Sequence, residues 1–147
     1  MMSRHALIAL TLALTLNASA GSILEEPTFS SPDSRPWVVM VTQPGCSFCT
    51  RLESEVLQPL RASGEFQERV RFTTVDIGVA APLIDFDGSK TTTVQFANRY
   101  QGYGTPTLLF LSPDGEELAP PKFGVPDLID FYAFEVEETI RNLSTVN

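Results

Sequence analysis

The chain has 147 residues, of which 43% are hydrophobic and 19% charged. This composition excludes a disordered or fibrous protein and favours a single globular domain. The formal net charge of −8 argues against nucleic acid as a partner, because binding phosphates requires a basic surface.

The first twenty residues predict an export signal peptide over residues 1–20. Arg4 provides a basic start, an apolar run from Ala6 to Leu16 is too short to span a bilayer, and Ala18-Ser19-Ala20 forms a cleavage site. Cleavage after Ala20 would leave 127 residues with a net charge of −9, since Arg4 is the only charged residue removed. No later apolar stretch is long enough to cross a bilayer, so we expect an exported protein without stable membrane insertion.

The only histidine, His5, lies in this signal. The exported domain therefore lacks the residue needed for Ser-His or Cys-His catalysis and for imidazole metal ligation.

Polar residues 21–35 predict a mobile lead-in, and we place the ordered domain at residues 36–147. Trp37–Val41 is a continuous apolar run, typical of a strand buried on both faces. The turn formers Pro44 and Gly45 follow it, and a helix then begins near Cys46. Pro59 is expected either to kink this helix or to begin a second short one.

The second half of the chain predicts further strands and helices in alternation. The expected strands are Arg71–Ile77, Thr105–Leu111 and a hairpin partner from Glu116, and a helix over 94–100 precedes Gly102. Residues 82–88 are expected to form a loose connection. Beyond Pro126, one apolar stripe predicts a closing helix: Leu128, Phe131, Tyr132, Val136, Ile140 and Leu143. The order βαβαββα indicates a small α/β domain.

Cys46 and Cys49 are the only cysteines, and they could form a redox pair, an inert bridge or half of a metal site. A structural bridge stabilises mainly by closing a long loop, whereas this loop is minimal. Zinc needs four ligands, and the exported chain offers two cysteines and no histidine. We therefore favour the redox pair and expect no metal.

The position of the pair at a strand-to-helix turn suggests different roles for the two sulfurs. Unpaired amides and the helix dipole favour a negative sulfur at Cys46, which we expect to be the exposed nucleophile. Cys49 lies about one turn further along, where it could resolve a mixed disulfide formed at Cys46.

Cys46-Ser47-Phe48-Cys49 after a buried strand, followed further on by Gly104-Thr105-Pro106-Thr107, resembles the thioredoxin superfamily over nearly all of 36–143. Segments 85–88, 96–100 and 109–115 resemble bacterial periplasmic thioredoxin-related proteins, including those associated with sulfur oxidation. The resemblance implies a thioredoxin-like fold and a periplasmic location.

The resemblance also implies that the Thr105–Pro106 bond is cis and faces the dithiol, so that the Thr105 backbone can bind an extended substrate. The alternative is a trans proline that merely begins an edge strand. Pro44, Gly45, Ser47 and Phe48 complete the expected substrate-binding residues, and Tyr103 is a further candidate for an apolar docking surface.

Three departures from the family pattern bear on redox direction. Met40 stands where thioredoxins hold a buried Asp, so the proton of Cys49 needs water or another acid. Ser47 and Phe48 provide no histidine cation between the cysteines, and Gly45 replaces the usual Trp. We therefore predict a modestly lowered Cys46 pKa and a moderately reducing pair.

These features predict an exported thiol-disulfide oxidoreductase that acts on protein or small-molecule disulfides, needs no cofactor and draws electrons from a membrane-linked donor. Two alternatives remain open: a redox-sensing or partner-binding module without turnover, and a reductase of a sulfur-carrier protein. No dimerisation segment is evident before Pro36, so a monomer is expected.

The remaining charged and aromatic side chains are interpreted as structural. Arg51, Glu53 and Glu55 are expected on a solvated helix face. The core is expected to include Phe72, Phe96, Phe110, Phe131 and Phe134.

Overall fold

The computed structural model describes residues 27–143. The expected signal peptide over residues 1–20 and the first part of the lead-in lie outside the described residues. No helix of the described part is long and apolar enough to cross a membrane.

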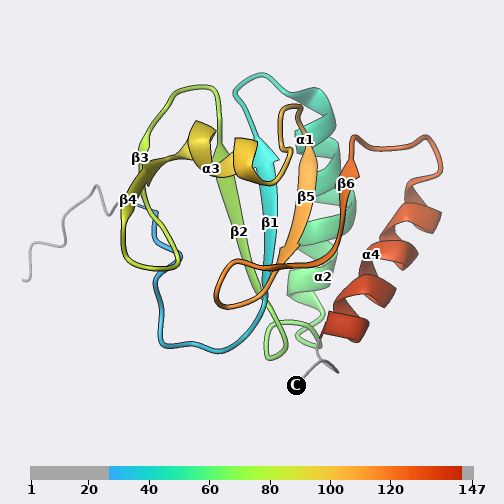
Figure 1. The fold of residues 1–147 in the computed structure, drawn as a ribbon. Coiled ribbons are helices and arrows are strands. Elements are labelled where there is room, and N and C mark those ends of the chain that lie inside the picture. The colour runs from blue at the N-terminus through green and yellow to red at the C-terminus, as the bar shows by residue number, and fades with distance from the viewer. Residues whose placement is uncertain (1–26, 144–147) are drawn as a thin grey trace, which may run out of the picture.

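A four-stranded mixed sheet forms the centre of the domain, in the order β2 (Arg71–Asp76), β1 (Trp37–Thr42), β5 (Thr107–Leu111) and β6 (Glu117–Phe123) (Figure 1). Strand β1 runs parallel to β2 and antiparallel to β5, and β6 pairs antiparallel with β5. The α/β class is confirmed. Because β6 is an edge strand, it tolerates Pro120 and Pro121, which cannot donate to a ladder.

Strand β1 is buried on both faces because alternate side chains enter two separate cores. Val38 and Met40 belong to the hydrophobic core on one face of the sheet, and Val39 and Val41 belong to the core on the opposite face. The first side carries α4 (Ile129–Leu143) and the helical run after the cysteines, and the second carries α3 (Thr93–Arg99) (Figure 1).

The helical run after the cysteines is continuous from residue 47 to 62 but changes its hydrogen bonding. It consists of α1 (Ser47–Leu52), a π-helical segment η1 (Glu53–Leu57) and α2 (Gln58–Ala62). Pro59 lies in the first turn of α2, where its missing N–H is tolerated. Of the two alternatives expected at Pro59, the structure shows the second short helix: α2 begins at Gln58, directly after the π segment.

The connection expected to be loose contains a hairpin, β3 (Pro82–Ile84) paired with β4 (Lys90–Thr92). Strands of only three residues are too short to show an alternating pattern in the sequence. At its turn, the nearly buried carboxylate of Asp85 binds the Arg99 guanidinium at 2.5 Å, and this contact raises the pKa of Arg99.

Packing of the chain begins before Pro36, which corrects the expected domain boundary. Phe29 is 2% exposed, and its ring stacks on Phe96 at a centroid distance of 4.4 Å. Its backbone N–H also donates to the carbonyl oxygen of Ile84. One aromatic residue in a polar, proline-containing segment gives no periodic signal, so the sequence did not predict this contact.

Helix α4 is confirmed, but its apolar stripe divides between core and solvent. Tyr132, Val136, Ile140 and Leu143 are buried, whereas Leu128 is 75% exposed. Phe131 and Phe134, expected in the core, are 62% and 56% exposed, because the helix turns the opposite side toward the sheet.

Replacing Phe29 with alanine is expected to lower the free energy of unfolding by about 3–5 kcal/mol, since it opens a cavity in the aromatic cluster. Urea denaturation of the full chain measures this change. Phe134→Ala removes an equally large but exposed ring and is the matched control, with an expected change of about 0.5 kcal/mol or less. A Phe29→Ala change as small as that of the control would show that residues 27–35 are not part of the folded unit.

Candidate functional site

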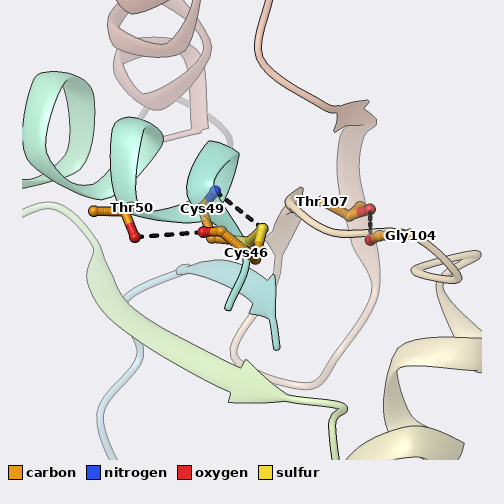
Figure 2. The surroundings of a disulfide bond; sticks show 5 residues. All are labelled: Cys46, Cys49, Thr50, Gly104 and Thr107. Carbon is orange, nitrogen blue, oxygen red and sulfur yellow. Dashed lines mark hydrogen bonds between the residues drawn. A yellow bond between two sulfur atoms is a disulfide. The ribbon is translucent and has the colours of Figure 1, made fainter. Parts of the chain in front are cut away.

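Cys46 and Cys49 form a disulfide at the beginning of the first helix, with the two Cα atoms 5.2 Å apart (Figure 2). The helix follows directly on the turn after β1, so the central strand determines the position of both sulfurs. The sequence prediction of a disulfide-forming pair at a strand-to-helix turn agrees with this geometry.

Cys46 caps the helix with its own side chain. Its backbone is extended, and its Sγ accepts a hydrogen bond from the backbone N–H of Cys49 at 3.1 Å (Figure 2). The N–H and hydroxyl groups of Thr50 both donate to the carbonyl oxygen of Cys46, at 3.1 and 3.3 Å. An amide already directed at this sulfur favours the thiolate when the bond is opened.

The two sulfurs differ in their access to solvent. Cys49 is only 4% exposed, whereas Cys46 is half-buried and lies next to the exposed residues Gly45 and Ser47. Phe48 is 56% exposed, so its ring lies on the surface beside the pair. This arrangement matches the expected division between an accessible Cys46 and a protected Cys49.

The turn before the cysteines requires glycine at two positions, one within the turn and one in a segment that packs against it. Gly45 has φ of +75°, which favours glycine, and Pro44 beside it is exposed. A Cβ atom on Gly78 would lie 2.5 Å from Cδ of Pro44, so only glycine allows this approach. The role of Gly78 could not be predicted from the sequence, because this residue belongs to no motif.

A second loop reaches the same end of the sheet. The Thr105–Pro106 bond is cis, Thr105 is half-buried and Pro106 is buried. Thr107 pairs with Val41 in the sheet, which places this loop beside the turn that leads to Cys46. The hydroxyl of Thr107 donates to the carbonyl oxygen of Gly104 at 2.8 Å and closes the loop (Figure 2).

The backbone of this loop is only partly used within the protein. The N–H of Gly124 donates to the carbonyl oxygen of Pro106 at 2.8 Å, but among residues 27–143 the N–H and C=O of Thr105 have no backbone partner. Tyr103 and Phe123 are 71% and 60% exposed. The contribution of the segment around Phe123 and Gly124 was not foreseen, because it lies far along the chain in an unremarkable edge strand.

A hollow of about 440 Å³ lies directly beside the disulfide. It is lined by residues of β1, the following turn and the helix: Met40, Thr42, Gln43, Gly45, Cys46, Ser47, Cys49, Thr50 and Glu53. Apart from the two sulfurs, Glu53 is the only ionisable group among these lining residues. Glu53 is only partly on the solvated helix face predicted from the sequence: its side chain is 36% exposed, but its Oε2 atom is buried.

Within residues 27–143, no three His, Cys, Asp or Glu side chains are grouped closely enough to hold a metal ion. The chemical groups of the candidate site are the two sulfurs, the backbone amide of Cys49, the backbone of Thr105 and the carboxylate of Glu53.

Comparison with known proteins agrees with this architecture. Residues 30–122 match the family model of the thioredoxin-like domain, while no curated protein matches the chain. A thioredoxin-fold protein from Helicobacter pylori is similar with a TM-score of 0.55 and 15% identity, over 84% of this chain and 92% of that one.

Two further solved structures show the same fold. A thioredoxin from Thermus thermophilus matches with a TM-score of 0.53 and 22% identity, over 83% of this chain and 89% of that one. The DsbH oxidoreductase matches with a TM-score of 0.52 and 17% identity, over 91% of this chain and 95% of that one. The thioredoxin-like fold is therefore confirmed.

After reduction of the disulfide, iodoacetamide is expected to alkylate Cys46 at least about tenfold faster than Cys49, because Cys46 is more accessible and its sulfur accepts an amide hydrogen bond. Timed quenching and peptide mass spectrometry distinguish the two sites. Guanidinium-unfolded protein is the control, in which the difference should disappear. Equal rates in the folded protein would contradict the proposed asymmetry.

Proposed function

This chain belongs to the thioredoxin-like domain family, and from that premise we propose that it is an exported thiol-disulfide oxidoreductase. The observation that carries the proposal is the Cys46–Cys49 disulfide at a helix N-terminus, with a protected second sulfur. A redox pair needs an exposed attacking sulfur and a nearby resolving sulfur, and this pair provides both.

The reaction proceeds in two exchanges. The Cys46 thiolate attacks a substrate disulfide, forms a mixed disulfide and releases one substrate thiolate, which takes a proton from solvent. Cys49 loses its proton and attacks Sγ of Cys46, which releases the second substrate thiolate. The substrate gains two electrons and the protein becomes the Cys46–Cys49 disulfide.

Substrate binding is proposed at the loop that contains Thr105 and Pro106. The unpaired N–H and C=O of Thr105 could bond to an extended substrate segment as a neighbouring strand would. Backbone pairing of this kind is tolerant of sequence. The exposed turn at Pro44, Gly45 and Ser47 with the ring of Phe48 supplies the remaining contact surface.

Further expectations from the sequence complete the proposal. The protein acts in the periplasm as a monomer and is supplied with electrons by a membrane-linked donor, and reduction of a sulfur-carrier protein is the alternative to action on protein disulfides. The pair favours reduction, because no histidine between the cysteines adds a cation to stabilise the thiolate.

Reduction of insulin by dithiothreitol tests the activity. The wild-type protein should accelerate the precipitation of reduced insulin chains, Cys46→Ala should give only the uncatalysed rate, and Cys49→Ala should accumulate a disulfide between Cys46 and insulin. Non-reducing electrophoresis and mass spectrometry detect that adduct. A wild-type protein that neither turns over nor forms the adduct would favour a redox-sensing or binding module.

The equilibrium reduction potential of the pair tests its direction. In glutathione or dithiothreitol buffers, thiol alkylation should give a value more negative than about −200 mV, in the range of reductases. A value between about −120 and −180 mV would instead indicate oxidase or isomerase chemistry. A value far below about −300 mV would indicate an inert bridge.

A further inference from the structure

Glu53 occupies an unusual position for a carboxylate on a helix. Its N–H donates to the carbonyl oxygen of Cys49, so the two residues lie one turn apart, and side chains at this spacing share a helix face with Cβ atoms about 6 Å apart. Both residues line the hollow beside the disulfide. Glu53 is therefore the ionisable group that shares this hollow with the resolving sulfur.

The two oxygens of this carboxylate have different surroundings. Oε1 is paired with the guanidinium of Arg61, two turns further along the same helical run. Oε2 is buried and accepts no hydrogen bond from any described residue. A buried acceptor without a donor is costly, and such groups in native proteins commonly have a functional reason.

The other side of the hollow offers no alternative proton acceptor. Met40 faces it from β1 with a thioether, and Thr42 and Gln43 have side chains that do not take up a proton near neutral pH. Cys49 itself is 4% exposed, so bulk water has little access to its thiol. The resolving step needs Cys49 as a thiolate, and a carboxylate in the hollow can accept the proton directly or through one water.

We propose that Glu53 is the general base of the resolving step, taking the proton of the Cys49 thiol as Cys49 attacks Sγ of Cys46. This inference rests on the proposed function. The S–H bond of Cys49 breaks, its proton moves to Glu53, the Cys46–Cys49 bond forms, and the substrate leaves as a thiolate. In the reverse direction, protonated Glu53 returns the proton to Cys49.

Stopped-flow reaction of the reduced protein with stoichiometric dithiobis(nitrobenzoate) separates the two exchanges. The first coloured thiolate reports attack by Cys46, and the second reports resolution by Cys49. In the wild type, the rate of the second phase should level off with rising pH once Glu53 is ionised. Glu53→Gln should slow this phase at least about tenfold near neutral pH, make it rise with hydroxide concentration and leave the first phase within about threefold.

Two variants provide controls for structural effects. Glu55→Gln makes the same change on the same π segment, but Glu55 is exposed, pairs with Arg51 and does not line the hollow, so both phases should stay within about twofold of wild type. Arg61→Gln removes the ion pair but keeps the base. Loss of this cation should move the acid limb of the second phase to higher pH, because Glu53 then ionises less readily.

The outcomes separate the two proposals. Absence of both phases in the wild type refutes the oxidoreductase itself. Two wild-type phases, with a Glu53→Gln second phase unchanged in rate and pH profile, refute the role of Glu53. If Glu53→Gln does not fold, Arg61→Gln decides: a shifted acid limb supports the base, and an unshifted limb overturns it.

Discussion

The antiparallel pairing of β1 with β5 is the contact on which the candidate site depends. It sets Val41 opposite Thr107, one residue beyond Pro106, and the chain leaves β1 for the turn to Cys46 at the same end of the sheet. Neither the loop that contains Pro106 nor the turn that leads to Cys46 has regular secondary structure of its own to hold it in position. The ladder between two strands buried on both faces holds them together, and a shift of one residue would exchange the side chains of the two cores.

The sequence was sufficient for those elements in which local pattern and tertiary environment agree. The apolar run from Trp37, the turn formers before Cys46 and the periodicity of the last helix each predict an element that the structure contains. Of the candidate site, the two cysteines and their different access followed from residue spacing and the strand-to-helix turn. The cis bond before Pro106 followed only from resemblance, since spacing cannot distinguish the two isomers.

The features that the sequence did not predict all depend on contacts between distant segments. Phe29 enters the core only because α3 and the short β3–β4 hairpin form a surface for its ring. Phe131 belongs to the apolar stripe of the last helix but is exposed, and Phe134 lies off that stripe, so only the packing of α4 shows which of its aromatic side chains face solvent. Gly78 and Gly124 reach the site from the segments that follow β2 and β6, so their importance is visible only in three dimensions.

Met40 and Glu53 illustrate how one core position and one helix position affect the same chemistry. Met40 adds apolar volume to the core and avoids the cost of an ionised group beneath the sheet, but it leaves the hollow beside Cys49 without a proton acceptor from β1. A carboxylate at Glu53 can remain ionised at lower cost, because Arg61 neutralises one oxygen at the partly exposed side. The acid thus lies on the helix that carries the sulfurs, where its distance from Cys49 depends on one turn of helix rather than on the packing of helix against sheet.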